Sequence, residues 1–225
     1  VSSTWGTGLA ENRTGSMNLK WEVSTKTNFG IDARFFDDKV DMTVDFFHTK
    51  TTDIFQRRAN IPDEGGLSNV LPYANIGSMK SWGMDGTLAY THTFNKDMAL
   101  TVRGNFTHAE NEVIYWEQSG VNYPYQSNSG VPYKVQRGLI ALGLFKDEDD
   151  IKSSPKQTFM DNYRPGDIKY KDVNGDGKID KDDVVPLNYS AVPFIQYGFA
   201  LDWNYKAFRV SILFEGVSKV QYFQG

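Results

Sequence analysis

Apolar and polar residues alternate with a period of two in three pairs of segments along this chain. The pairs span residues 29–35 with 40–47, 84–94 with 98–107, and 197–205 with 208–215. Short turns at 37–39, 95–97 and 206–207 join the two halves of each pair. A period of two is typical of β-strands with one apolar face. The pattern therefore predicts three antiparallel hairpins, and no comparable helical period organises the chain.

Two all-β architectures produce such strands. A soluble sandwich turns the apolar face inward, whereas a membrane barrel turns it toward lipid and encloses a polar lumen. The apolar stretches are about 9–12 residues long, which suits a tilted strand that crosses a bilayer. Aromatic residues gather at the expected strand ends, at Phe35-Phe36, Phe46-Phe47, and Trp203 with Tyr205. These features favour an antiparallel transmembrane β-barrel segment of about six spanning strands in three hairpins.

The two faces of the predicted barrel wall carry different residues. The alternation assigns four apolar residues to the lipid side and four charged residues to the lumen. The lipid set is Leu88, Val102, Leu201 and Ile212, and the lumen set is Asp85, Arg103, Asp202 and Arg209. Charged residues in the middle of a strand suit a water-filled lumen.

The lengths of the connections support the same architecture. Outer-membrane barrels have short turns on the periplasmic side and long loops outside. Here the hairpins are separated by long connections, roughly 54–81 and 110–192. The apolar stretch 137–145 would reverse this alternation if it crossed the membrane. We therefore assign 110–192 to one extracellular loop region and expect 137–145 to pack within it.

Within this region, residues 172–183 have the ligand spacing of a calcium loop of the EF-hand type. Side-chain oxygens fall at the first, third, fifth, ninth and twelfth positions, a glycine (Gly177) at the sixth, and a backbone carbonyl at the seventh. The six candidate ligands are Asp172, Asn174, Asp176, Lys178 through its carbonyl, Asp180 and Asp183. The flanking helices of an EF-hand are missing. The spacing predicts one structural calcium ion, and an acidic solvated turn is the alternative.

Composition excludes several classes of function. The chain has no cysteine and no apolar run of about 18 residues, so it offers no thiol chemistry and no transmembrane helix. Its net charge of −4 argues against nucleic-acid binding. His48, His92 and His108 have no metal-ligand spacing, and no nucleophile motif occurs, so we expect no enzyme. The sequence at Val1 looks like the middle of a protein, and Gly225 follows a strand pattern without a closing signal. We therefore expect a part of a longer protein.

Aromatic residues in the long loop region are weak candidates for substrate binding. They are Tyr115, Trp116, Tyr123, Tyr125, Tyr133 and Tyr163. Aromatic rings line many ligand pockets, but aromatic residues in loops also pack the loop itself. The sequence leaves both roles open.

Several motifs together resemble the barrel of SusC/RagA-type TonB-dependent transporters, in its C-terminal portion. They include Asn18–Asp32, Asp45–Ile54, the segment 75–85 with Asn75-Ile76-Gly77-Ser78-Met79, Gly143–Phe145 with Ser154-Pro155, and Pro165–Asp180. Ser81 and Asp85 depart from the Asn and Glu usual in this family. The resemblance covers most of residues 12–216 and places 1–225 in one barrel.

The resemblance implies a large barrel of about 22 strands with a plug, in the outer membrane of a Gram-negative bacterium. It also implies TonB-coupled import of oligosaccharides or peptides, and a SusD-like lipoprotein lid. The plug and the TonB-contacting segment lie outside this chain. A soluble calcium-dependent carbohydrate-binding β-sandwich module remains the alternative.

Overall fold

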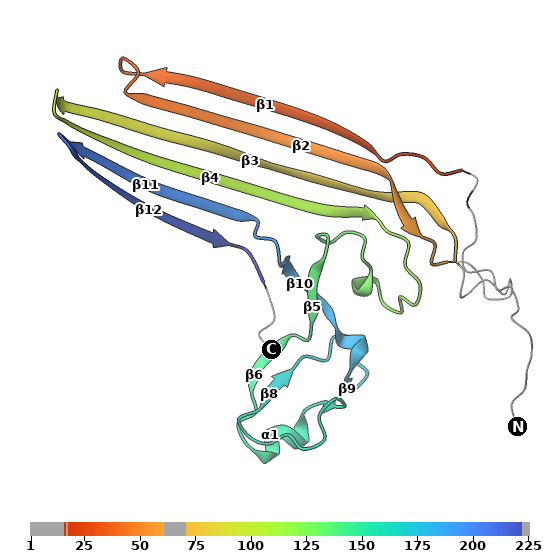
Figure 1. The fold of residues 1–225 in the computed structure, drawn as a ribbon. Coiled ribbons are helices and arrows are strands. Elements are labelled where there is room, and N and C mark those ends of the chain that lie inside the picture. Colours follow the sequence, from red (N-terminus) through yellow and green to blue (C-terminus); the bar gives the residue numbers. More distant parts are fainter. Residues whose placement is uncertain (1–15, 17, 61–70, 222–225) are drawn as a thin grey trace, which may run out of the picture.

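A computed structural model describes residues 16, 18–60 and 71–221 of the chain. Its main feature is a six-stranded antiparallel sheet with the strand order β1-β2-β3-β4-β11-β12 (Figure 1). The strands are β1 (Val23–Phe35), β2 (Val40–Arg57), β3 (Tyr73–Asn95), β4 (Met98–Tyr115), β11 (Ile195–Tyr205) and β12 (Phe208–Ser218). The three predicted hairpins are therefore present, and they lie side by side in one sheet.

Cross-strand register confirms that the predicted lipid and lumen residues lie on opposite faces. Val102 pairs with Tyr90 on one side and with Leu201 on the other, and Leu201 pairs with Ile212. Asp202 lies one position along and pairs with Thr101 and Ser211. Since side chains alternate between faces along a strand, one face is apolar across the whole sheet and the other is polar.

The apolar face is exposed, and this decides between the two architectures. Phe199, Ile212 and Phe214 are 46%, 45% and 64% exposed. Among the described residues, the only other sheets are two-stranded ones outside this sheet, so no second sheet covers the apolar face as a sandwich requires. The soluble sandwich module is therefore wrong, and an open section of a barrel wall fits the structure.

The register also shows where the apolar band ends. From Met84 to Phe94, the outward-facing residues of β3 are apolar or aromatic, except for His92. The length of this span is close to that needed to cross hydrocarbon. Two rows of polar residues then follow toward the long loops: His48, Trp82 and Glu110, and next Lys50, Lys80 and Glu112. Lys80 Nζ lies 3.0 Å from a carboxylate oxygen of Glu112 and 5.3 Å from the centre of the Trp82 ring. This Trp-and-charge belt marks the outer membrane interface.

The strands run past this belt, and this changes several predicted boundaries. Because β2 extends to Arg57 and β4 to Tyr115, the long connections cover 58–72 and 116–194 instead of 54–81 and 110–192. Phe46 and Phe47 consequently lie inside β2, so the prediction that they mark a strand end is wrong. Asp53 has a positive φ of 55° at an irregularity in the β2–β3 register. Such a bulge reverses which face the following residues occupy.

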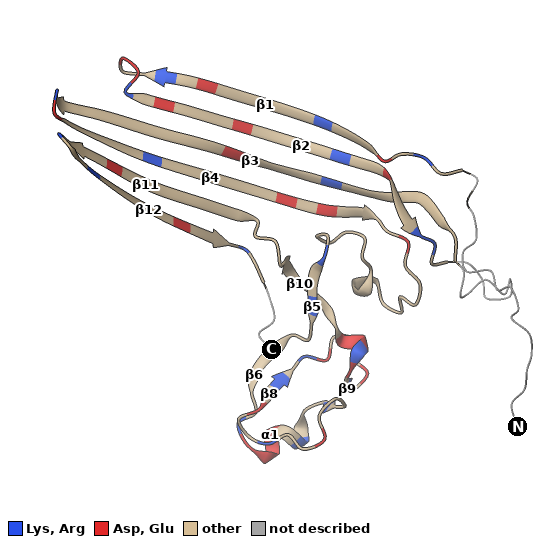
Figure 2. Cartoon of the chain, viewed as in Figure 1, with Lys and Arg blue, Asp and Glu red and all other residues tan. Residues whose placement is uncertain are grey.

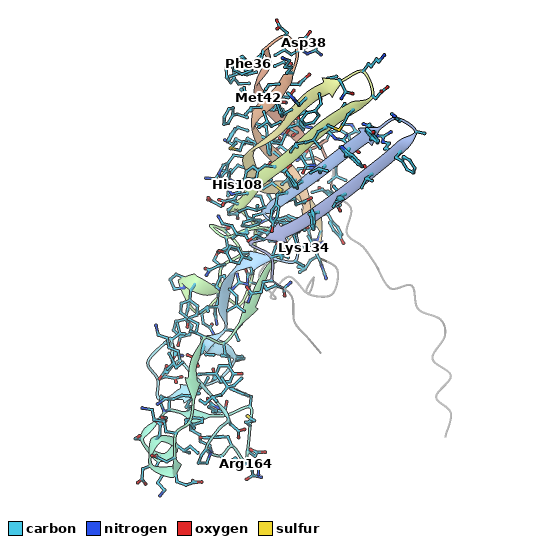
Figure 3. The ribbon with its side chains drawn as sticks, turned by 90° about the vertical axis from the view of Figure 1, so that its left-hand side faces the viewer. Phe36, Asp38, Met42, His108, Lys134 and Arg164 are labelled. Carbon is cyan, nitrogen blue, oxygen red and sulfur yellow. The ribbon has the colours of Figure 1, made fainter. Side chains whose placement is uncertain are left out.

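The connection 116–194 forms an elongated arm that extends away from the sheet (Figures 1 and 3). Three two-stranded sheets build it: β5 (Val135–Gly138) with β10 (Val185–Ser190), β6 (Ala141–Leu144) with β8 (Ile168–Tyr170), and β7 (Lys156–Gln157) with β9 (Lys178–Ile179). Helix α1 (Glu148–Ser153) and the 3-10 turns η2 (Pro124–Gln126) and η3 (Lys181–Asp183) complete it. In the described residues no helix is long and apolar enough to cross a membrane.

The apolar stretch 137–145 lies in this arm and does not join the six-stranded sheet, as predicted. Its packing differs from the prediction. Only Phe145 is buried, at 2% exposure, whereas Leu142 and Leu144 are 58% and 60% exposed. Pairing with β8 satisfies the backbone of β6 but leaves these side chains at the surface of the arm.

Candidate functional site

The predicted metal loop turns on two glycines and is shaped by hydrogen bonds from its own backbone. Gly175 and Gly177 have φ values of 78° and 85°. Glycine adopts such positive values readily because it has no Cβ atom. The two carboxylate oxygens of Asp172 accept from the backbone N–H groups of these glycines, at 2.6 and 2.9 Å. Asp176 accepts from Lys178 N at 2.8 Å. These bonds bend the chain around the carboxylates, as a wrapped ion site requires.

The last ligand position is the most strongly held. Asp183 is fully buried and accepts from Val173 N at 2.7 Å and from Asp180 N at 2.9 Å. Ile179 is also fully buried, as its loop position predicts. The two ends of the loop are thus fastened together through one carboxylate. Hydrogen bonds from the loop backbone to both oxygens stabilise this buried carboxylate.

The carbonyl of Lys178 is oriented as a ligand would be. The neighbouring carbonyls of Gly177 and Ile179 accept from Lys156 N and Thr158 N in the parallel β7–β9 pair, at 3.4 and 3.0 Å. Successive carbonyls of an extended strand point in opposite directions, so that of Lys178 points away from β7. In the described part of the chain, no three His, Asp or Glu side chains converge closely enough to form a metal cluster by themselves. Calcium would use Asn174 and this carbonyl in addition to the carboxylates.

Two of the predicted substrate aromatics pack against the metal loop instead. Tyr123 and Tyr125 stack with ring centres 5.3 Å apart. The Tyr125 hydroxyl donates to the carbonyl of Asp182 at 2.6 Å, and the Tyr123 hydroxyl bonds the Asn174 amide at 3.2 Å. Burial, followed by the charges of nearby loop residues, raises the pKa of Tyr125, which keeps its hydroxyl a donor. These rings brace the loop, so the structure favours packing over substrate stacking for them.

Arg137, which the sequence did not single out as a site residue, fastens the segment after Tyr125. Its guanidinium donates to the carbonyl oxygens of Tyr125 and Ser127, at 3.3 and 2.6 Å, and to the side chain of Asn128 at 3.2 Å. Burial lowers the pKa of Arg137 from its ordinary value. The metal loop, the two tyrosines and this arginine consequently form one hydrogen-bonded unit.

The remaining aromatic candidates occupy three different places. Tyr163 stacks on buried Phe145 at 5.4 Å and packs the arm. Tyr115 is the last residue of β4 and is 47% exposed. Trp116 lies 6.2 Å from Tyr133, ring centre to ring centre, and both line a cavity at the junction of sheet and arm. Trp116 and Tyr133 are thus the predicted aromatics that line a cavity, and Tyr115 is exposed beside them in the sequence.

An ion pair at the same junction, with a buried carboxylate and a partly exposed arginine, was missed by the sequence reasoning. The side chain of Glu117 is 3% exposed; it accepts from Arg58 Nε at 2.7 Å and from Asn60 N at 3.1 Å. Arg58 and Asn60 come from the β2–β3 connection, so the pair joins the two long loops. No sequence motif signals a contact between residues so far apart in the chain.

The lumen face carries a second charged group. The Asp202 carboxylate accepts hydrogen bonds from the Arg103 guanidinium, at 2.5 Å, and from the Ser211 hydroxyl. Arg209 Nη2 lies 3.6 Å from Asp202 Oδ1. Three of the four predicted lumen residues are thereby in contact, while Asp85 lies opposite Asp45 on the same face. Figure 2 shows how sparsely charged residues are spaced along the strands. Pairs of opposite charges on neighbouring strands stabilise this water-facing side of the sheet.

The outward apolar face, the polar lumen face, the short turns at one end and the long loops at the other define a section of an outer-membrane β-barrel. Comparison with known proteins agrees. The family described as "TonB dependent receptor-like, beta-barrel" matches residues 2–223, and the chain belongs to this family. Its members are receptors of the Gram-negative outer membrane and not enzymes, which confirms both predictions.

Curated relatives and solved structures confirm the SusC/RagA type. TonB-dependent receptor P39 of Formosa agariphila is 30% identical over 241 residues, which cover 92% of this chain and 23% of the relative. TonB-dependent receptor SusC of Bacteroides thetaiotaomicron is 26% identical over 176 residues, covering 74% and 16%.

The structure of the RagAB peptide importer in the "open-open" state shares the fold. Its TM-score is 0.70 at 23% identity, and the match covers 95% of this chain and 22% of that one. The chain therefore spans roughly a fifth of the length of these relatives.

Proposed function

We propose that the complete protein is a nutrient importer, and that this chain forms part of its barrel wall. The observation that carries the proposal is the six-stranded sheet with an exposed apolar face and a charged opposite face. Such a wall separates lipid from a wet passage. Family membership adds energy coupling through TonB, by parts of the protein outside this chain. The cargo class that fits is an oligosaccharide or a peptide.

A SusD-like lipoprotein is the proposed lid partner. The arm extends beyond the outer interface belt and exposes Leu142, Leu144 and Ile168, at 58%, 60% and 44%. An apolar surface outside the membrane is typical of a protein contact. One relative was solved as the RagAB peptide importer, a complex by its name. Pull-down of the lipoprotein with the full-length protein, repeated for Leu142→Glu with Leu144→Glu, tests the contact.

Calcium is the proposed ion of the 172–183 loop. Asp172, Asn174, Asp176, Asp180 and Asp183 would supply side-chain oxygens, together with the carbonyl of Lys178. When bound, the ion would neutralise the repulsion between carboxylates and fix the loop shape. An extracellular site of this kind binds at about 10⁻⁴–10⁻³ M, so it stays filled without switching.

Metal analysis and protease sensitivity test the calcium site together. We expect close to one calcium per protein at millimolar calcium, and faster cleavage of the arm after chelation. The double variant Asp172→Ala with Asp176→Ala should abolish the effect of the chelator, whereas Asp149→Ala, in exposed helix α1, should not. Negligible calcium at millimolar concentration would reject the site.

Uptake in cells tests the importer itself. A strain that lacks the gene should grow poorly on its cargo, regain growth with the full-length protein, and lose it when TonB is deleted. Defined oligosaccharides and peptides supplied as sole nutrient identify the cargo class. Growth that never depends on TonB would reject active import.

A further inference from the structure

The junction between sheet and arm contains a cavity of about 230 Å³ that the metal loop and the ion pairs do not use. We propose that this cavity holds one apolar side chain of a peptide cargo; the inference rests on the importer function proposed above. Its lining residues are Val113, Trp116, Asn128, Val131, Pro132, Tyr133, Lys134 and Val135.

The cavity lies on the lumen side of the sheet. Val113 has the same parity along β4 as Arg103 and Asn111, so it belongs to the lumen face. Tyr133 N donates to the side chain of Asn111 at 2.7 Å, which draws the segment after Pro132 over that face. Figure 3 shows Lys134 where the sheet meets the arm. A cargo entering from outside would pass this point at the mouth of the lumen.

The chemistry of the wall selects for an apolar group. Four lining residues are aliphatic (Val113, Val131, Pro132, Val135) and two are aromatic, with Trp116 and Tyr133 tilted at 49°. These two rings contact each other at 6.2 Å, and the ring surface that they turn to the cavity can pack against a further ring or an alkyl chain. Pockets of this composition hold ligands mainly by apolar contact.

Part of the polar lining already has partners. The Asn128 side-chain oxygen accepts from Arg137 at 3.2 Å, and Lys134 Nζ lies 5.4 Å from the centre of the Tyr133 ring. The backbone of Val113 exchanges hydrogen bonds with Val131 and Gly130, at 2.9 and 2.7 Å. The four aliphatic side chains of the wall offer no partner to the hydroxyls of a sugar ring, and each hydroxyl buried against them without a partner is unfavourable. The wall therefore favours a peptide side chain over a sugar.

Hydrogen bonds within the protein hold the wall of the pocket in place. Trp116 N donates to the Ser129 hydroxyl at 3.0 Å, and Arg137 ties down the segment that carries Asn128. A fixed wall avoids the entropy cost of ordering loops on binding. The volume admits one large side chain, smaller than pockets that enclose a whole drug-sized ligand. The rest of the cargo would lie in the lumen mouth.

Photo-crosslinking on the full-length protein in detergent tests this site. The probe is a pentapeptide Gly-Gly-X-Gly-Gly whose third residue is benzoyl-phenylalanine, with cross-links located by mass spectrometry. We expect cross-links within 113–135, and competition by Gly-Gly-Phe-Gly-Gly roughly tenfold or more stronger than by Gly-Gly-Ser-Gly-Gly, from burial of one large apolar side chain. Maltopentaose should compete no better than the serine peptide.

Two variants and a control separate the cavity from general effects. Val131→Trp fills the cavity and Tyr133→Ala removes one wall; each should lower cross-linking at least tenfold. Phe159→Ala removes an exposed ring elsewhere on the arm and should leave it unchanged. All variants should keep the gel mobility of the folded barrel, which guards against misfolding.

The opposite results would overturn the inference. Cross-links outside 113–135, equal competition by the phenylalanine and serine peptides, or full cross-linking in Val131→Trp each reject the cavity as a side-chain site. Uptake in cells is read separately. If growth depends on TonB and any of these results is found, only the proposed role of the cavity is rejected and the importer function is kept. If growth is independent of TonB, the importer function is rejected.

Discussion

A charge placed on the lipid face should weaken the barrel far more than the same charge on the lumen face. Leu201 is the middle one of the five outward-facing positions between Tyr197 and Tyr205 of β11, and it pairs with Val102 and Ile212. It therefore lies close to the bilayer midplane. An arginine there costs about 2–4 kcal/mol. Since 1.4 kcal/mol is a factor of ten, the folding equilibrium should fall roughly 30- to 1000-fold.

Guanidinium unfolding of the full-length protein in lipid vesicles, followed by tryptophan fluorescence and gel mobility, measures this loss. Leu201→Arg should lower the midpoint, and Leu201→Ala should lower it less. Gln196→Arg is the matched control, because Gln196 lies on the lumen face of the same strand and is exposed. Equal losses for both arginine variants, or no loss for Leu201→Arg, would refute the assignment of the faces.

Three further predictions concern the external part. Glu117→Gln should weaken the junction with Arg58 by about 1.5–3 kcal/mol and speed proteolysis of the loops; unchanged cleavage would contradict it. The hydrogen bond from Lys169, 2.8 Å long, lowers the pKa of Asp150 below its ordinary value, so its stabilisation of α1 holds above pH about 4 and is lost as pH falls through the lowered pKa. Pepsin cleavage of the arm, normalised to that of an unfolded substrate at the same pH, should rise from pH 4.5 to pH 2.5, and this normalised rise should be smaller for Asp150→Asn. A protease site inserted after Ser153 should be cleaved in intact cells, and protection there would mean that the arm is not outside.

The period of the strands allowed the sheet to be predicted from sequence. A period of two assigns every side chain to a face, and the lumen and lipid sets follow from it without knowledge of the register. Strand ends were less predictable. Beyond the belt of Trp82 and Lys80 the outward face meets water, so the alternation fades although the ladder continues to Tyr115. The apolar pattern therefore reports the thickness of the membrane and not the length of the strand.

The loop region shows the other limit. The turn of the predicted metal loop follows from residues that all lie within 172–183, and the structure shows that turn at Gly175 and Gly177. Its neighbours could not be predicted. Tyr123 and Tyr125 reach it from about fifty residues earlier, and Glu117 meets Arg58 across a similar gap. Contacts at this range depend on how the arm folds back on the sheet. For that reason the sequence could not show that Tyr123 and Tyr125, two candidates for substrate binding, pack against the loop.

The central claim is that this chain is a section of barrel wall with lipid on one side and a passage on the other. Spin labels at Ile212 and Arg209, three positions apart on β12 and of opposite parity, test it most directly in the full-length protein in membranes. The account predicts that the label at Ile212 is reached by a lipid-soluble quencher and shielded from a water-soluble one, with the reverse at Arg209. Water access at Ile212 together with lipid access at Arg209 would contradict it.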